Sequence, residues 1–106
     1  MINKVILVGK LQNDAELKQT SNGKAMTRLT VRTTESFKKD GETQYDNQYH
    51  NVKIFGDWVQ STGLIDRLIK DTEVYVEGKL STYKYENKLG VEVYTTEIIV
   101  ETIRIL

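Results

Sequence analysis

The sequence contains no cysteine, no proline and only one histidine. The absence of cysteine excludes a disulfide framework, a thiolate nucleophile and a cysteine metal site. The single histidine, His50, argues against a histidine-based metal site, and no Ser-Asp or second carboxylate motif accompanies it as a catalytic centre would require. We therefore expect a chain that is not an enzyme and that carries no metal ion or other cofactor.

Long apolar runs are also missing. No segment approaches the length of a membrane-spanning helix, and the N-terminus lacks the charged lead and apolar core of a signal peptide. We therefore expect a cytosolic protein that makes no contact with a membrane. Its 106 residues suffice for one domain with one core, which we expect to span residues 1–106.

Neither sign of charge is in excess. The chain has 15 Lys and Arg residues and 15 Asp and Glu residues, so its formal net charge is zero. Proteins that bind nucleic acid usually show a basic excess. Composition therefore gives no support to nucleic-acid binding, and only a segregation of the two signs onto different surfaces would permit it.

The pattern of apolar residues predicts a mostly β protein. Strands are expected at residues 3–11, 26–34, 49–56 and 73–85, and a last strand or pair of strands at 91–106. Residues 35–48 are polar and are expected to form a long loop with a turn at Asp40-Gly41. Residues 57–70 have near-helical spacing, with Asp57 as a possible cap and Gly63 weakening the middle by roughly 1 kcal/mol.

Five strands with one helix between the third and fourth is the order of the OB-fold. This small, partly open Greek-key barrel commonly binds oligonucleotides or oligosaccharides. Small sandwiches and other barrels are compatible with the same order. No repeat or linker divides the chain, and we expect an all-β, five-stranded barrel with a single helix.

The predicted strand at 49–56 has two chemically different faces. Because successive side chains of a strand point in opposite directions, Tyr49, Lys53 and Phe55 share one face, while His50 and Ile54 lie on the other. Aromatic rings beside a cation suit base stacking and phosphate binding. Alternation alone favours the plainer interpretation, in which the two rings are surface packing residues.

Neighbouring segments add cations and rings to the same predicted surface. Phe37 is followed by Lys38 and Lys39, and Arg28 and Arg32 fall on the polar face of the strand at 26–34. Lysine and arginine displace the counterions condensed on a nucleic-acid backbone, while aromatic rings stack on its bases. Together they favour contact with single-stranded nucleic acid.

Four motifs, in unbroken order, resemble the DNA-binding domain of bacterial single-stranded DNA-binding proteins. They are NKVILVGKL at 3–11 followed by DAEL at 14–17, YHNV at 49–52 with FG at 55–56, VYVEGKL at 74–80, and YTTE at 94–97. The match extends from the start of the chain to about Val100. Four motifs at compatible spacing are far more specific than any single one.

The resemblance implies an OB-fold that forms a homo-oligomer, typically a tetramer, and coats single-stranded DNA without reading its sequence, in replication, recombination and repair at the nucleoid. It places the family's stacking aromatics at Phe37, Tyr49, Phe55 and Tyr85. The family usually has tryptophan at three of these positions, so stacking should persist on smaller rings.

The remaining candidates complete the expected surfaces. Tyr83 is a further candidate for stacking. We expect phosphate contacts from nine cations: Lys10, Lys18, Arg28, Arg32, Lys38, Lys39, Lys53, Lys79 and Lys84. His50 corresponds to a family position near the subunit contact, and Tyr75 and Glu77 are expected on an association surface. Trp58 falls on an apolar phase and is expected in the core or as a cap of the barrel.

Other interpretations remain open. The family's flexible linker and acidic tail do not appear before Leu106, so partners recruited by such a tail are not expected from this chain. A primosome-type OB-fold adaptor, in which DNA binding is secondary to protein contact, is the main alternative. A metal-dependent nuclease would need acidic clusters, and the pairs Asp14 with Glu16 and Asp66 with Asp71 are more typical of turns and caps.

Overall fold

The computed structural model describes residues 1–106 as six strands and two short helical turns. The strands are β1 (Val5–Leu11), β2 (Glu16–Gln19), β3 (Ala25–Lys39), β4 (Glu42–Phe55), β5 (Glu73–Glu86) and β6 (Glu92–Ile105). An α-helical turn, α1 (Trp58–Ser61), and a 3-10 turn, η1 (Leu64–Arg67), lie between β4 and β5. The sheet order is β1-β5-β6-β4-β3-β2, and a further pairing of β1 with β3 closes the barrel.

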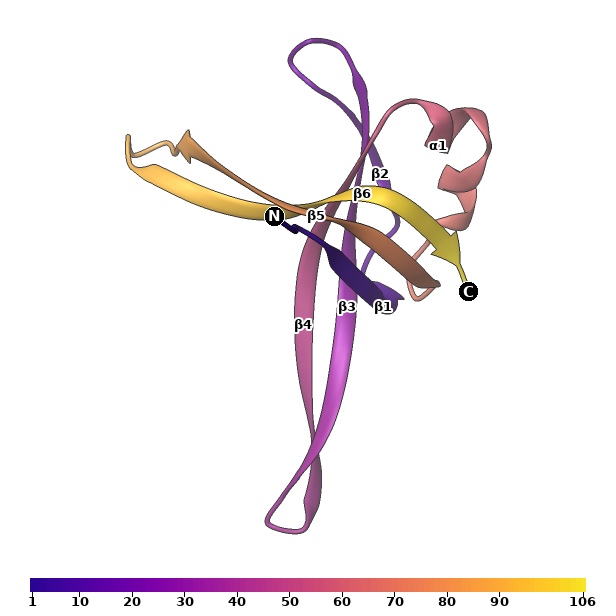
Figure 1. Cartoon of the computed structure of the whole chain (residues 1–106), viewed down its shortest axis with the longest axis vertical. Helices are drawn as coiled ribbons and strands as arrows, with labels where there is room; N and C mark the ends of the chain where they lie inside the picture. The colour runs from indigo at the N-terminus through magenta and orange to yellow at the C-terminus, as the bar shows by residue number, and fades with distance from the viewer.

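The closed sheet confirms the predicted all-β OB barrel with helical structure after its third long strand. All strand pairs are antiparallel except β4 with β6, which run parallel. The short strand β2 was not predicted, because its four residues are all exposed and show no apolar alternation. Two long ribbons, β3–β4 and β5–β6, project from the barrel in different directions (Figure 1).

The expected loop at residues 35–48 is instead the outer half of the β3–β4 ribbon. Pairing continues without a break from Met26 opposite Phe55 to Lys39 opposite Glu42. Both faces of this outer part are in solvent, so it has none of the apolar alternation from which strands are predicted. The predicted turn is confirmed, because Asp40 and Gly41 have φ of 54° and 78°. Positive φ at both central residues is typical of a two-residue hairpin turn.

The expected helix at residues 57–70 is reduced to two separate turns. Gly63 has a φ of 78° between α1 and η1, and a left-handed glycine ends a helix. Asp57 precedes α1, but its side chain makes no capping hydrogen bond. Trp58 is 39% exposed and does not join the core. Neither turn is long and apolar enough to cross a membrane.

The core lies inside the barrel, where strands from both ribbons contribute apolar side chains. It consists of Leu11, Leu29, Val31, Val52, Ile54, Val59, Leu68, Val74, Val76, Ile98 and Ile103. On the outer face of β1, Ile6 and Val8 are more than half exposed. Only the inner face of β1 is therefore covered within one copy of the chain.

Closure of the barrel depends on a close backbone approach at Gly9. A Cβ atom there would lie 2.4 Å from the carbonyl oxygen of Arg32 on β3. Because that neighbour is backbone, it cannot move without opening the β1–β3 pairing. Gly9→Ala should therefore lower the free energy of unfolding by about 1–3 kcal/mol, the usual cost of overpacking.

Urea denaturation measures this effect. Lys10→Ala, at the exposed neighbouring position, is the control and should change the free energy of unfolding by no more than about 0.5 kcal/mol. Equal stabilities of Gly9→Ala and Lys10→Ala would contradict this account of closure.

Candidate nucleic-acid interface

One face of the β3–β4 ribbon carries aromatic and cationic side chains and no carboxylate. Cross-strand partners share a face, and the register places Arg28 opposite Lys53 and Arg32 opposite Tyr49. We call this the cationic face. Its side chains are Met26, Arg28, Thr30, Arg32, Thr34, Ser36 and Lys38 from β3, and Thr43, Tyr45, Asn47, Tyr49, Asn51, Lys53 and Phe55 from β4.

The reverse face of the ribbon carries the acidic residues. Near the barrel it supplies core side chains, and farther out it presents Glu35 opposite Asp46 and Glu42 opposite Lys39. The two faces therefore differ in charge although the chain as a whole is neutral. This is the segregation of signs that nucleic-acid binding by a neutral chain requires.

The cationic face continues across the barrel onto the second ribbon. Lys53 is paired with Ile99 of β6, and Ile99 with Lys79 of β5. At this junction the surface is hollowed into an open depression of about 540 Å³, lined by Lys53, Phe55, Lys79, Ser81, Tyr83, Glu97 and Ile99. The residues Phe55 and Tyr83 are each more than 40% exposed beside it, so flat ligand groups have access to both.

Lys53, Tyr83 and Glu97 form a network at the base of this depression. The Lys53 ammonium lies 2.7 Å from Glu97 Oε2 and 3.3 Å from the Tyr83 hydroxyl oxygen, and that hydroxyl donates to Glu97 Oε1. Burial opposes ionisation of Glu97, but its contacts with Lys53 and Tyr83 outweigh burial, so the pKa of this carboxyl is lowered. Burial likewise opposes the charge of Lys53, yet the same contacts raise its pKa.

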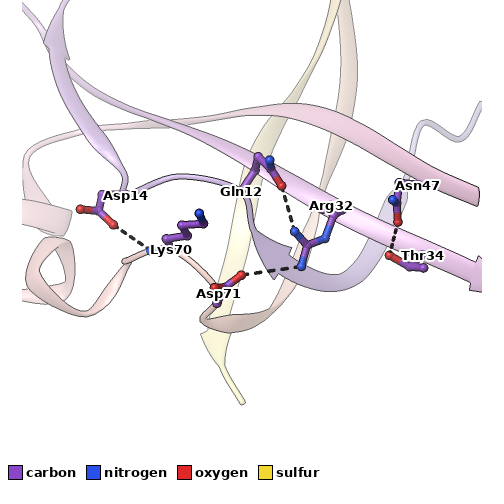
Figure 2. Close-up of polar contacts among 7 residues, drawn as sticks. All are labelled: Gln12, Asp14, Arg32, Thr34, Asn47, Lys70 and Asp71. Atoms are coloured by element: carbon purple, nitrogen blue, oxygen red, sulfur yellow. Dashed lines mark hydrogen bonds and ion pairs between the residues drawn. The ribbon is translucent and has the colours of Figure 1, made fainter.

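Arg32 is held at the end of the barrel where β1 meets β3 (Figure 2). Its guanidinium donates to Gln12 Oε1 at 3.0 Å and lies 3.7 Å from Asp71 Oδ1. Lys10 pairs with Arg32 across the β1–β3 contact, so Lys10, Arg32 and Tyr49 form a second row across three strands. These contacts orient the Arg32 guanidinium, and the Asp71 carboxylate also neutralises part of its positive charge.

Three of the four carboxylates considered as metal ligands have structural roles. Asp14 accepts a hydrogen bond from the backbone N–H of Lys70 at 2.8 Å, and Asp71 faces Arg32 (Figure 2). Glu16 forms an ion pair of 3.3 Å with Lys18 on β2. No group of three or more His, Asp or Glu side chains gathers in a way that could hold a metal ion.

The other predicted DNA contacts are divided between the two faces of the ribbons. Lys18 pairs with Met26 on the cationic face, and Tyr85 shares the face of Tyr83 by alternation along β5. Lys84 lies on the opposite face of β5 and forms a 3.6 Å ion pair with Glu92. Phe37 and Lys39 pair with Gln44 and Glu42 on the reverse face of the β3–β4 ribbon.

The structure thus brings together most of the predicted site residues but not all of them. Phe37, Lys39 and Lys84 lie on the reverse faces of the two ribbons. The predicted residues that share the cationic face and its continuation are Tyr49, Phe55, Tyr83, Tyr85, Lys10, Lys18, Arg28, Arg32, Lys38, Lys53 and Lys79. DNA contact by any of these residues stays a prediction.

Two residues of this surface were not predicted. Tyr45 is 69% exposed and lies opposite Ser36 on the cationic face. Its alternation with Tyr49 would have indicated this, had the strand been extended to residue 42. Glu97 lies on β6 just beneath this surface, and no local pattern indicates that its carboxylate pairs with a lysine 44 positions earlier.

The residues predicted to lie at a contact between copies of the chain are found in two separate parts of the structure. Tyr75 and Glu77 lie opposite Val8 and Ile6 on the outer face of β1 and β5. The Tyr75 hydroxyl donates to Glu77 Oε1 at 2.8 Å, and with Lys4 at 3.2 Å it lowers the pKa of Glu77. His50 is separate, because it lies on β4 and its Nε2 is 2.8 Å from the Thr33 hydroxyl.

Comparison with known proteins gives consistent results. The model of the Single-strand binding protein family matches residues 2–106. A single-stranded DNA-binding protein of Xanthomonas axonopodis pv. citri (strain 306) is 42% identical over 106 residues, covering 99% of this chain and 58% of the relative. The chain therefore spans little more than half the length of that relative.

Two solved structures share the fold. The Plasmodium falciparum SSB complex with ssDNA aligns with a TM-score of 0.81 at 24% identity, covering 100% of this chain and 96% of that one. A deletion mutant of the single-stranded DNA binding protein from Thermus aquaticus aligns with a TM-score of 0.79 at 26% identity, covering 99% and 50%.

The buried pair of Lys53 and Glu97 generates a prediction about stability. Lys53→Met leaves the Glu97 carboxylate buried without its ammonium partner, and the free energy of unfolding should fall by about 3–5 kcal/mol at pH 7. Replacing both residues, as Lys53→Met with Glu97→Gln, should cost less, because no charge is then left unpaired. Urea denaturation of the single and double variants measures the difference, and an equal cost would contradict the pairing.

The same pair predicts how stability depends on pH. The pKa of Glu97 is below its ordinary value of 4.5 in the folded chain, so its ionised form favours folding above pH 4.5, and this contribution is lost as pH falls through the folded pKa. The stability difference between the native chain and Glu97→Gln should therefore shrink in acid. Glu101→Gln, at an exposed position, is the control. A difference that grows below pH 4.5 would contradict the assignment.

Proposed function

The chain belongs to the single-strand binding protein family, and from this we propose that it binds and coats single-stranded DNA without reading base sequence. Bases stack on exposed aromatic rings, and lysine and arginine side chains contact the phosphates. The role is that of a binding protein in replication, recombination and repair, without catalysis or a cofactor. We place it at the nucleoid, and we propose that residues 1–106 act as one DNA-binding domain.

The observation that carries this proposal is the composition of the cationic face. A single strand offers unpaired bases and a line of phosphates, and this face offers rings and cations in adjoining rows. Tyr49 and Phe55 are each about half exposed, and Arg28 pairs with Lys53 between them. Stacking accepts any base because every base has a π-face, which accounts for binding without sequence preference.

The acidic residues on the reverse face of the β3–β4 ribbon support the proposal that DNA binds only the cationic face. Glu35 and Asp46 are directly opposite each other there, and two carboxylates repel a phosphate backbone. A neutral chain can therefore have a high local density of cations on one surface. Tyrosine and phenylalanine present smaller rings than tryptophan, so each stack should contribute toward the lower end of the usual range.

A second copy of the chain is the other proposed partner. Ile6 and Val8 leave an exposed apolar strip on β1, bordered by Tyr75 and Glu77 of β5. Burying such a strip between copies removes apolar area from water. We propose a homo-oligomer, with a tetramer as the family's usual number.

A direct test titrates the chain with oligo(dT) and follows the fluorescence of Trp58 and the tyrosines. Tyr49→Ala together with Phe55→Ala should weaken binding by a few kcal/mol, at roughly 1–3 kcal/mol per lost stack. Tyr94→Ala is the matched control, because Tyr94 is 69% exposed and lies opposite Lys84 on the other face of the β5–β6 ribbon. Equal losses in the double variant and the control would remove this surface from the site.

Sedimentation tests the proposed association. Ile6→Lys places a charge in the exposed apolar strip of β1, where Glu77 opposite it is already paired with Lys4, so the new ammonium would be buried between copies without a partner of its own. The expected result is a shift toward the monomer at equal protein concentration. Lys24→Ala removes a charge from the exposed turn before β3, away from the strip, and serves as the control. An unchanged sedimentation coefficient for Ile6→Lys would place the subunit contact elsewhere.

A further inference from the structure

The carboxylate of Glu97 lies directly beneath the candidate DNA-binding surface. By alternation along β6 it shares a face with Ile99, which belongs to the row that includes Lys53 and Lys79. The residue is nevertheless only 2% exposed. A carboxylate beneath a surface that binds a polyanion would weaken that binding by repulsion. Its presence there therefore calls for another role.

We infer that Glu97 is a positioning residue that withholds Lys53 from DNA phosphates and fixes the ring of Tyr83 as a stacking surface. This inference rests on the proposed function, because it divides the cationic face into side chains that neutralise phosphates and side chains that support stacking. It also changes the role of Lys53 from the one predicted from sequence.

The contacts of Lys53 leave it little capacity for a phosphate. Its side chain is 15% exposed, and its ammonium is within 2.7 Å of Glu97 Oε2 and 3.3 Å of the Tyr83 hydroxyl. Only a cation that meets a phosphate releases a condensed counterion. The charge of Lys53 is already balanced by a buried carboxylate, so it adds nothing to that release.

The neighbours of Lys53 in the same row differ from it. Arg28 and Lys79 are exposed, and neither forms an ion pair within the chain. Arg28 is near enough to Glu97 to help lower the pKa of that carboxyl, but no direct contact holds Arg28 or Lys79, and both can meet phosphates. The row therefore consists of two outer cations that contact the backbone and an inner lysine that does not.

Tyr83 is held at two points. Its hydroxyl donates to Glu97, and the Lys53 ammonium lies 5.0 Å from the centroid of its ring, within the range of a cation–π contact. The residue is still 42% exposed, beside Phe55 at the depression. A ring already immobilised loses less conformational entropy when a base stacks on it, so the network preorganises this stack.

The salt dependence of oligo(dT) binding separates the two roles of the cations. Each phosphate neutralised adds about −0.7 to the slope of log K against log salt for a single strand. Glu97→Gln frees the charge of Lys53, and the slope should become steeper by about 0.7. Glu97→Gln with Lys53→Met removes both charges, and the slope should return to the native value. Arg28→Gln, the positive control, should make the slope shallower by about 0.7.

Binding at 1 M salt isolates the stacking role, because charge effects there are screened within about 3 Å. Tyr83→Phe keeps the ring but loses the hydroxyl that anchors it to Glu97. It should bind about 3- to 10-fold more weakly, the cost of immobilising one more side chain, with an unchanged salt slope. Tyr94→Phe, which loses a hydroxyl on the other face of the ribbon, should bind as the native chain does.

The outcomes are distinguishable from failure of the proposed function. If the native chain shows no saturable binding that depends on salt, the proposed function itself is wrong. If it binds, but the double variant has a slope shallower by about 0.7, Lys53 contacts a phosphate and the inference is wrong. An unchanged slope in a folded Glu97→Gln chain would also overturn it, and far-ultraviolet circular dichroism confirms folding of each variant.

Discussion

The pairing of β3 with β4 is the constraint on which the rest of the structure depends. Its register runs over fourteen consecutive residue pairs, and because side chains alternate, one register fixes both faces of the ribbon at once. A slip of one residue would put Leu29 opposite Asn51 or Lys53 instead of Val52, so one of the two strands would turn its apolar side chains out of the core and its polar ones into it. The apolar face, which must be buried, therefore selects the arrangement of rings and cations on the other face.

The same constraint explains how a neutral chain can present a basic surface. In the barrel the reverse face of the ribbon is core, and beyond the barrel it is free to carry Glu35, Glu42 and Asp46. On the side that faces the proposed ligand, other strands contribute Glu16 and Glu97, which each pair with a lysine, and Glu73, which lies opposite Lys10. Net charge therefore conceals a separation of signs that follows directly from strand alternation.

Much of the fold followed from local patterns. The strand at 26–34 with Arg28 and Arg32 on its polar face, the turn at Asp40-Gly41 and the two-faced strand at 49–56 were predicted correctly, because each depends on residues close together in the chain. The outer half of the β3–β4 ribbon was not predicted. Its strands are stabilised by backbone hydrogen bonds between two polar segments, and hydrophobic periodicity carries no information about such bonds.

The candidate site was predicted in part, for a related reason. Alternation placed Tyr49 and Phe55 together, and the family resemblance added Tyr85. The pairing of Lys53 with Glu97 depends on the parallel contact between β4 and β6, which brings together residues far apart in the sequence. Phe37 and Lys84 were assigned without knowledge of strand register, and register decides which face of a ribbon each side chain occupies.

Photo-crosslinking tests most directly whether single-stranded DNA binds the cationic face. An oligo(dT) carrying a photoactivatable uracil would be irradiated in complex with the native chain, and the modified residues identified by mass spectrometry. We expect adducts at Tyr49, Phe55 and Tyr83, on the adjoining faces of the two ribbons. Adducts confined to Tyr75 and Tyr94, which lie away from that surface, would contradict it.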